Sequence, residues 1–374
     1  MTPQGAGYRE HEAAAADRLR ILIAGGGTGG HVIPGLAIAR EMRDRYGAEV
    51  RFVGTTRGLE TRLVPEAGFG LELIEVGQLK NVSMAIRART MADLPLGIRR
   101  CMKLLRGLRP HVVVGVGGYA SGPAILAAVL MRVPTLAYEP NAAPGLANRI
   151  VGRMVSAAAL NFEESRRFFR NAEVTGVPVR QEFFSLPERA AGAAPRLLVF
   201  GGSQGARALN LVMPEVIVKL LARVPGLTVL HQAGGRHVDA TTEAYAATEA
   251  DPGRWRVEAF LDDMPARFAE ASLILCRSGS SVAELAAAGK PSLLVPFPQA
   301  ADDHQRKNAE VFARAGAAAV LLEAEMTPER LSDELMRMLQ DDVGLRKMSE
   351  RARELARPDA LERIGAMVRG LTEL

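Results

Sequence analysis

Gly25-Gly26-Gly27-Thr28-Gly29-Gly30 is the stretch that decides the fold. The apolar run Leu19 to Ala24 leads into it, and Pro34 to Met42 has the residue pattern of a helix. A strand, a glycine turn and a helix in this order open a doubly wound α/β sheet. The sequence therefore predicts such a sheet at its start.

The opening pattern returns in the second half of the chain. Arg196 to Phe200 precedes Gly201-Gly202-Ser203-Gln204-Gly205, and a helix follows from about Ala206 to Leu221. Further strand-like runs alternate with helical stretches, as parallel sheets require: Val50 to Val53, Val112 to Val116, Pro134 to Tyr138, Leu227 to Gln232, Ser272 to Cys276 and Ser292 to Pro296. We expect an α/β protein of two Rossmann-like doubly wound domains that face each other across a cleft.

The length of the chain and the positions of glycine and proline predict the domain boundaries. The 374 residues suffice for two domains, each with a core of its own. Gly176-Val177-Pro178 punctuates the middle of the chain. We expect a flexible tail over 1–17, a first domain over 18–178, a second over 179–357, and a C-terminal helix over 358–374 that returns to the first domain.

Composition narrows the class of protein. Only Cys101 and Cys276 are present, far apart, which excludes a disulfide framework or a zinc site and indicates a reducing compartment. Aromatic residues make up 5% of the chain, which is low for a module that stacks on carbohydrate. Apolar runs such as Ala124 to Met131 are shorter than the roughly 20 residues of a membrane span. These features favour a cytoplasmic α/β enzyme.

Charge is distributed unevenly between the two halves. Residues 18–178 carry 22 Lys and Arg against 12 Asp and Glu, a net charge of +10, whereas residues 179–374 carry 24 against 27, a net charge of −3. The basic half therefore favours an anionic partner: a nucleic acid, a membrane surface or a phosphorylated substrate.

The first glycine run is open to more than one interpretation. Gly25-x-Gly27-x-x-Gly30 matches the dinucleotide fingerprint, but the strand that follows ends in Gly54-Thr55 without the acidic residue that holds a ribose. A P-loop is excluded, because His31-Val32 stands where Lys and Ser or Thr would be needed.

A third glycine cluster follows another predicted strand, in Gly117-Gly118-Tyr119-Ala120-Ser121-Gly122-Pro123. Three such loops exceed what turn geometry alone requires. Backbone N–H groups at the helix starts behind them form sites for anions. The loops therefore favour a ligand that carries a diphosphate.

Four long stretches together closely resemble the MurG family, the N-acetylglucosaminyltransferases of bacterial peptidoglycan synthesis. They are residues 25–35, residues 117–123, Gly201 to Arg207, and Cys276-Arg277-Ser278-Gly279 through Glu284. The resemblance runs in order from about Arg20 to the C-terminus. It implies a GT-B architecture and an inverting transfer of GlcNAc from UDP-GlcNAc to the C4 hydroxyl of undecaprenyl-diphospho-MurNAc-pentapeptide, giving a β-1,4 link.

On the acceptor side, the resemblance assigns His31 to removal of the C4 proton. Imidazole suits this role, because its ordinary pKa lies near working pH; the alternative is an imidazole that only braces its loop. Asn141 lies in Tyr138-Glu139-Pro140-Asn141, where the family commonly has His-Glu-Gln-Asn, and is expected to contact GlcNAc hydroxyls. The remaining residues expected to bind substrate in this half are Thr28, Gly29, Gly30 and Tyr119.

On the donor side, the resemblance assigns Ser203 to the donor phosphate, Arg180 to the nucleotide and the backbone at Leu261 to uracil, and Gln204 is also expected to bind substrate. The structural alternatives are a helix N-cap for Ser203, a linker salt bridge for Arg180 and a core leucine for Leu261. The resemblance covers two more residues of this half. It assigns Glu284 to the ribose hydroxyls and Gln305 to the donor sugar. Both of these have a structural alternative, since Ser281-x-x-Glu284 and Asp302-x-x-Gln305 also fit capping boxes. No Asp-x-Asp clamp accompanies the loops, so we expect no metal ion and no cofactor, and helix N-termini that stabilise the departing UDP.

A basic amphipathic segment indicates a second partner. Between Lys80 and Arg109 the only acidic residue is Asp93. Helical spacing predicts one face with Ile98, Met102 and Leu105 and another with Arg99, Lys103 and Arg106. An ordinary surface helix would look similar, but the net charge of this half favours an anionic membrane surface and a peripheral location on the cytoplasmic face of the inner membrane. No aromatic stacking platform accompanies the charges, so we expect no nucleic acid.

Two other functions remain open from the sequence. A related transferase that glycosylates another lipid, such as a diacylglycerol, would share the donor loops. A scaffold that binds UDP-sugar without turnover would not need the acceptor-side residues His31, Tyr119 and Asn141, all of which are present.

Overall fold

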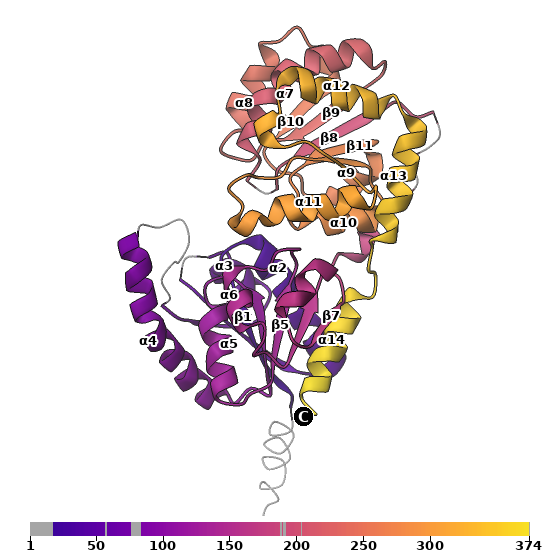
Figure 1. Cartoon of the computed structure of the whole chain (residues 1–374). Coiled ribbons are helices and arrows are strands. Elements are labelled where there is room, and N and C mark those ends of the chain that lie inside the picture. Colours follow the sequence, from indigo (N-terminus) through magenta and orange to yellow (C-terminus); the bar gives the residue numbers. More distant parts are fainter. Residues whose placement is uncertain are drawn as a thin grey trace, which may run out of the picture. The chain divides into compact units, whose positions relative to one another are not determined.

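The computed structural model describes residues 18–56, 58–75, 84–187, 189, 192–202 and 204–373, and for residues 84–93 only the backbone. The predicted tail over 1–17 and the predicted phosphate ligand Ser203 lie outside these residues. The chain divides into two compact units (Figure 1). Unit 1 comprises Met1–Pro140, Pro144–Pro178 and Asp359–Leu374, and unit 2 comprises Asn141–Ala143 and Val179–Pro358.

Unit 1 is built on a seven-stranded sheet in the order β3-β2-β1-β4-β5-β6-β7. All neighbouring strands pair in parallel. The strands are β1 (Arg20–Gly25), β2 (Glu49–Gly54), β3 (Gly70–Leu73), β4 (Val112–Gly117), β5 (Thr135–Glu139), β6 (Ala157–Leu160) and β7 (Ala172–Val174). Strands β1, β4 and β5 are buried along nearly their whole length, as expected for parallel strands covered on both faces.

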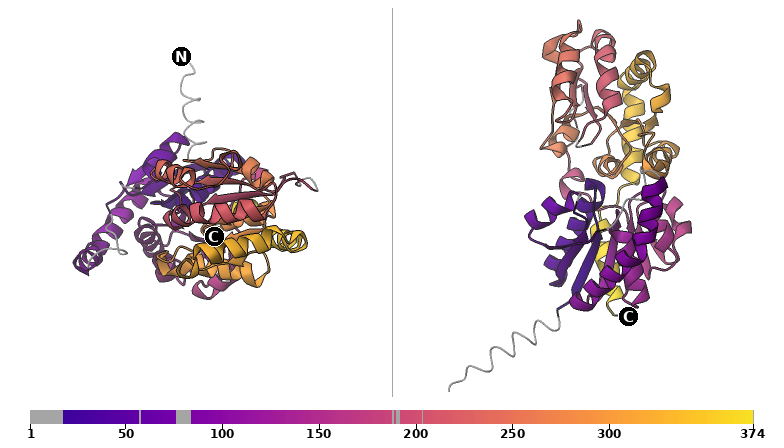
Figure 2. Two further views of the ribbon diagram at one scale, coloured as in Figure 1. Left: turned by 90° about the horizontal axis from the view of Figure 1, so that it is seen from above. Right: turned by 90° about the vertical axis from the view of Figure 1, so that its left-hand side faces the viewer.

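Helices cover the sheet of unit 1. They are α2 (Gly29–Tyr46), α3 (Glu60–Glu66), α4 (Met84–Leu108), α5 (Ser121–Leu130), α6 (Leu146–Val151) and α14 (Ala360–Leu371). The C-terminal helix α14, yellow in Figure 2, packs against α2 and contacts β4, β5 and β6. Arg363 of this helix donates to Glu173 of β7 at 2.6 Å. The last helix of the chain is thus a structural part of unit 1.

Unit 2 contains a six-stranded parallel sheet in the order β10-β9-β8-β11-β12-β13. Its strands are β8 (Arg196–Phe200), β9 (Thr228–Gln232), β10 (Trp255–Glu258), β11 (Leu273–Cys276), β12 (Ser292–Leu294) and β13 (Ala319–Val320). Its helices are α7 (Arg207–Arg223), α8 (Val238–Ala246), α9 (Met264–Glu270), α10 (Ser281–Ala288), α11 (His304–Arg314), α12 (Pro328–Leu339) and α13 (Asp342–Glu354). Short 3-10 turns complete both units at Glu163–Phe168, Gln181–Phe183, Pro252–Arg254, Ala301–Asp303 and Glu323–Glu325.

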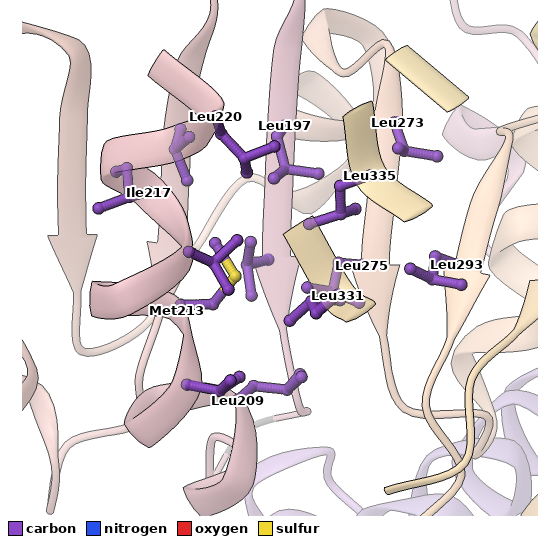
Figure 3. Packing of buried hydrophobic residues seen from close by; sticks show 14 of the residues in the cluster. Leu197, Leu209, Met213, Ile217, Leu220, Leu273, Leu275, Leu293, Leu331 and Leu335 are labelled. Carbon is purple, nitrogen blue, oxygen red and sulfur yellow. The ribbon is translucent and has the colours of Figure 1, made fainter. Parts of the chain in front are cut away.

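A layer of aliphatic side chains joins α7 and α12 to the sheet of unit 2 (Figure 3). Leu209, Met213, Ile217 and Leu220 recur at intervals of three or four residues, so α7 presents one apolar stripe. The same cluster contains Leu197, Leu275 and Leu293 of the strands and Leu331 and Leu335 of α12. In Figure 3, Leu197 lies beside the α7 stripe, and the layer continues past the α12 residues to Leu293. This packing fixes the start of α7 behind the second glycine loop.

One helix begins earlier than the sequence pattern predicts. The helix expected at Pro34 starts at Gly29, within the glycine run, because the Thr28 carbonyl accepts from the N–H groups of His31 and Val32. Pro34 therefore lies inside the helix and not at its start. The consequence is functional, since His31 lies in the first turn of α2.

Candidate functional site

Each sheet has its glycine loop at the point where the strand order reverses. In unit 1 this point lies between β1 and β4, and in unit 2 it lies between β8 and β11. Open parallel sheets bind ligands outside the carboxyl ends of the strands at this point. The sequence prediction of two doubly wound sheets with glycine turns at their binding edges is therefore confirmed.

In unit 1, His31 is held by the loop that precedes it. Its Nδ1 lies 3.2 Å from the carbonyl oxygen of Gly26 and 3.4 Å from the hydroxyl of Thr28. A carbonyl only accepts hydrogen bonds, so a hydrogen bond at this contact places the proton of the neutral imidazole on Nδ1 and leaves Nε2 as the basic nitrogen. A Cβ added at Gly117 would lie 2.9 Å from His31 Nε2, so the imidazole sits directly over the end of β4.

The first and third glycine clusters touch. The Gly26 N–H donates to the Gly117 carbonyl at 3.3 Å, and a Cβ at Gly118 would lie 2.3 Å from the Gly26 oxygen. Gly118 is thus required by close approach of the two loops and by its φ of +84°. Tyr119 follows immediately and is exposed. The predicted residues Thr28, Gly29, Gly30, His31 and Tyr119 therefore gather at one edge of unit 1.

Glu60 is a residue that sequence reasoning missed. It opens α3, is 1% exposed, and accepts from the Gly27 N–H at 2.7 Å and from both the N–H and the hydroxyl of Thr55 at 2.9 Å. Burial alone raises the pKa of its carboxyl, but the hydrogen bonds from Gly27, Thr55 and its own backbone outweigh burial and lower that pKa. In the sequence, Glu60 belongs to no recognisable motif and looks like any surface glutamate, so the sequence alone did not indicate its role.

Asn141 belongs structurally to unit 2. Its Oδ1 accepts from Asn308 Nδ2 at 3.2 Å, and the neighbouring Ala142 N–H donates to Asn308 Oδ1 at 2.9 Å. Asn308 also donates to the Ser278 carbonyl at 3.1 Å. The sequence placed Asn141 on the acceptor side; the structure groups it with the loop behind β11 and with α11.

The loop before Asn141 rests on a buried carboxylate. Glu139 accepts from Asn148 Nδ2 at 2.9 Å and from the Gly145 N–H at 3.2 Å, which ties the end of β5 to α6. Tyr138 is fully buried, and its hydroxyl has no hydrogen-bond partner among the described residues.

In unit 2, neutral side chains brace the second glycine loop. Gln232 Nε2 donates to the Gly202 carbonyl at 3.1 Å, and Asn210 Nδ2 donates to the Ala233 carbonyl at 2.9 Å. Gly205 is required here, because a Cβ at this position would lie 1.8 Å from the Ala233 oxygen. Gln204 also lies at this crossing, with its carbonyl 2.3 Å from a Cβ built on Gly234.

Behind the same loop lies a buried polar network. His231 Nδ1 lies 2.9 Å from the Tyr245 hydroxyl, and its Nε2 lies 3.1 Å from Asn210 Oδ1. Burial lowers the pKa of His231 to about 3, so this imidazole is neutral. The network connects β9 and α8 to the first turn of α7.

Glu284 lies in the first turn of α10 and is half-buried. Burial raises the pKa of its carboxyl to about 7, and the positive charge of Arg180 partly offsets this rise. The capping-box alternative is wrong, because the helix is preceded by Ser280 and no side chain caps it. Glu284 and Arg180, distant in sequence, therefore act on each other electrostatically.

Gln305 does not cap its helix either. Its Oε1 accepts from the Phe297 N–H at 3.0 Å, its carbonyl accepts from Ser278 Oγ at 2.8 Å, and its Nε2 lies 3.7 Å from a Cβ built on Gly279. It thus joins the loops behind β11 and β12. Arg277 supports the second of these loops through the carbonyl oxygens of Val295 and Pro296.

Leu261 is buried, as the core alternative anticipated, while the adjacent Phe260 is 56% exposed. A backbone contact to a base at this position is compatible with a buried Leu261 side chain. Arg180 lies over the ring of Phe183, with its guanidinium carbon 5.1 Å from the ring centre.

A separate cavity of about 620 Å³ lies between α7 and α8, bordered by residues that include Leu211, Val218 and Ala244. None of the predicted site residues lines it. Within the described part of the chain, no group of three or more His, Cys, Asp or Glu side chains is arranged to hold a metal ion.

The described half of α4 has the two faces predicted from its sequence. Leu105 is buried and Ile98 and Met102 pack against the core, whereas Arg99, Lys103 and Arg106 are exposed. Large apolar side chains are also exposed on unit 1, among them Leu96, Leu130, Ile150 and Met154. Lys80 and the side chains of Arg87, Arg89 and Asp93 lie outside the described residues. No helix in the described ranges combines the length and the apolar character of a membrane span.

Comparison with known families agrees with both units. Residues 21–160 match the glycosyltransferase family 28 N-terminal domain, and residues 196–364 match the glycosyltransferase family 28 C-terminal domain. Two parallel sheets with these paired matches define a glycosyltransferase of the GT-B architecture, and the fold class expected from the sequence is confirmed.

Full-length relatives narrow the class. The UDP-N-acetylglucosamine–N-acetylmuramyl-(pentapeptide) pyrophosphoryl-undecaprenol N-acetylglucosamine transferase of Solibacter usitatus is 45% identical over 345 residues, which cover 91% of this chain and 93% of that relative. The transferase of the same name from Myxococcus xanthus is 40% identical over 353 residues, covering 92% and 91%. The crystal structure of Acinetobacter baumannii MurG matches with a TM-score of 0.79 and 31% identity, covering 94% of this chain and 99% of that chain. The chain therefore belongs to the MurG family.

Proposed function

We propose that this chain transfers N-acetylglucosamine from UDP-N-acetylglucosamine to N-acetylmuramyl-(pentapeptide) pyrophosphoryl-undecaprenol, a step of peptidoglycan synthesis. The observation that carries the proposal is the match, over more than nine-tenths of the chain, to relatives that bear this name. The grouping of His31 and Tyr119 at one edge of unit 1, and of the donor-side residues together with Asn141 in unit 2, supports it.

In the proposed reaction, the C4 hydroxyl of the muramyl sugar attacks the anomeric carbon of the donor. The bond from that carbon to the diphosphate oxygen breaks, UDP departs with the electron pair, and the new β-1,4 bond has inverted configuration. His31 Nε2 takes the hydroxyl proton. The Nδ1 contact to the Gly26 carbonyl supports this role, because it favours the tautomer with a basic Nε2.

Unit 2 holds the donor in this proposal. Glu284 accepts from the ribose hydroxyls, the Leu261 backbone contacts uracil, and Gln305 and Asn141 bind the sugar. Ser203 and Gln204, with the start of α7, bind the diphosphate, and Arg180 faces the nucleotide. The hydrogen bonds among Gln305, Ser278 and Asn308 support a preformed sugar site. Thr28, Gly29, Gly30 and Tyr119 bind the acceptor in unit 1.

We further propose that unit 1 docks on an anionic membrane surface at the cytoplasmic face of the inner membrane, where the lipid-linked acceptor is found. The exposed Arg99, Lys103 and Arg106, together with the exposed Leu130 and Ile150, support this location. Each basic side chain near such a surface contributes about 1 kcal/mol.

A transfer assay tests the reaction. Labelled UDP-N-acetylglucosamine is offered with either the muramyl-pentapeptide lipid or a diacylglycerol as acceptor. Label in the muramyl lipid is the expected result. Label only in the diacylglycerol would favour the related lipid transferase, and UDP-sugar binding without label in either lipid would favour a scaffold.

A further inference from the structure

The carboxylate of Glu60 is enclosed by glycines. A Cβ added at Gly26, Gly54 or Gly58 would lie 2.2, 2.6 or 1.8 Å from a side-chain atom of Glu60. A larger residue at any of these three positions would therefore displace the Glu60 side chain from its place. The sequence placed Gly26 in an anion-binding loop; in the structure, its lack of a side chain leaves space for the carboxylate of Glu60.

The hydrogen bonds of Glu60 reach one particular peptide group. Its Oε2 accepts from the Gly27 N–H at 2.7 Å, while the Gly26 carbonyl accepts from His31 Nδ1 at 3.2 Å. The Gly26 C=O and the Gly27 N–H belong to the same planar amide, in which they point in opposite directions when the bond is trans. The described chain contains no cis peptide bond. Glu60 and His31 therefore bind opposite sides of one amide.

We propose that Glu60 is a positioning residue for His31, acting through the amide between Gly26 and Gly27. The carboxylate fixes the plane of this amide and polarises it, so that its carbonyl holds the proton on Nδ1 and keeps Nε2 basic. This is the role of the carboxylate in a carboxylate–histidine pair, carried out across one peptide unit. The inference rests on the proposed role of His31 as the base.

Two further contacts support a precise placement of the carboxylate. The Thr55 N–H and hydroxyl both donate to Oε1 at 2.9 Å, which anchors Glu60 to the end of β2. The Leu59 N–H donates to the Gly27 carbonyl at 3.2 Å, so the N–H and the carbonyl of Gly27 are both held by the adjacent residues Leu59 and Glu60. Among the described residues, the Gly27 N–H holds Oε2, and the N–H and hydroxyl of Thr55 hold Oε1, so the carboxylate is fixed with one oxygen on this amide.

The first test is a double-mutant cycle on transfer kinetics. Glu60→Gln should lower kcat by about 10- to 100-fold, because the NH2 group of the new amide must face either the Gly27 N–H or the Thr55 N–H, both of which are donors, while the KM for UDP-N-acetylglucosamine stays unchanged. In the His31→Ala background, Glu60→Gln should change kcat by less than about twofold. If Glu60→Gln lowers kcat by the same factor in the wild type and in His31→Ala, the proposal is overturned.

Matched variants separate this role from folding. Glu66→Gln removes an exposed carboxylate at the other end of the same helix and should leave kcat unchanged. Thr55→Val removes one donor to Glu60 without removing the charge and should lower kcat by only a few-fold. A loss for Glu66→Gln as large as that for Glu60→Gln would show a general effect of charge and refute the inference.

A measurement on the unaltered protein keeps the inference testable if Glu60→Gln fails to fold. With ¹⁵N-labelled histidine, the ring resonances of His31, assigned by their loss in His31→Ala, should report the tautomer with its proton on Nδ1. A proton on Nε2 would overturn the Glu60 inference whatever the kinetics. If instead His31→Ala keeps full kcat, the base role in the proposed function fails, and this result is distinct because the tautomer is measured independently.

Discussion

Replacing Glu284 with glutamine tests the proposed ribose site through the stability of the unliganded protein. The pKa of this carboxyl is raised from 4.5 to about 7 by burial, against the partial offset from Arg180. Between these two pH values the folded state binds more protons than the unfolded state. The free energy of unfolding therefore falls as pH rises from 4.5 to 7 and stays low above 7.

The size of this effect follows from the shift. One pKa unit corresponds to about 1.4 kcal/mol, so a rise from 4.5 to about 7 sets a ceiling of about 3 kcal/mol. Glu284 keeps some contact with water, which reduces the expected value to roughly 1 to 2 kcal/mol. Glu284→Gln has nearly the same shape and no charge. At pH 8 and without donor, it should be more stable than the wild type by that amount, and at pH 4.5 the two should be equal.

Denaturant unfolding at the two pH values measures the difference, and Glu329→Gln is the matched control. Glu329 lies in the first turn of α12 and is exposed, so its removal should give no gain at pH 8. The KM for UDP-N-acetylglucosamine should rise about tenfold or more in Glu284→Gln, because a charge-assisted bond to a hydroxyl contributes about 1.5 to 3 kcal/mol. A variant that is less stable at pH 8 and keeps its KM would refute the ribose role.

Three further predictions follow from the geometry. His31→Ala should lower kcat by about 10²-fold or more with unchanged UDP affinity by calorimetry, because His31 lies in unit 1; an equal loss of UDP affinity would contradict the base role. A triple variant in which Glu replaces Arg99, Lys103 and Arg106 should no longer sediment with anionic vesicles at low salt. The control variant, with Glu at the exposed Arg351 of unit 2, should still sediment. Unchanged sedimentation of the folded triple variant would exclude this docking surface. Burial lowers the pKa of His231 from 6.5 to about 3, so between pH 6.5 and 4 the unfolded state binds a proton at this residue that the folded state does not, and the free energy of unfolding falls as pH falls. His231→Gln should remove this contribution, which is up to about 1.4 kcal/mol per pH unit. Identical pH dependence in the two proteins would show that His231 does not titrate in this way.

The sheets were predictable because their signals are local. Buried parallel strands appear in the sequence as short apolar runs, and the glycine turns follow them directly. The predicted face of α4 with Ile98, Met102 and Leu105 is confirmed for the same reason, since helical spacing alone decides which side chains share a face.

The contacts that organise the loops were not predictable. Glu60 reaches the Gly27 amide across 33 positions of sequence, and Asn308 reaches Asn141 across 167. Spacing within an element carries no information on such pairs. The capping boxes failed for a related reason, because the helix start at Ser281 and the conformation of Asp303 are set by the loops before them and not by the motif.

The structure also separates two loops that look alike in sequence. In the first loop, the Gly27 N–H donates to the carboxylate of Glu60. Around the second loop, the side-chain amides of Gln232 and Asn210 donate to carbonyl oxygens. A fixed negative charge opposes a second anion at the same amide, while neutral donors on carbonyl groups impose no such penalty. The glycine run that most resembles a phosphate-binding fingerprint is therefore the one whose Gly27 amide is already committed to an internal anion. This difference supports the proposed division, in which the donor diphosphate is bound by the second loop and the first loop carries the base.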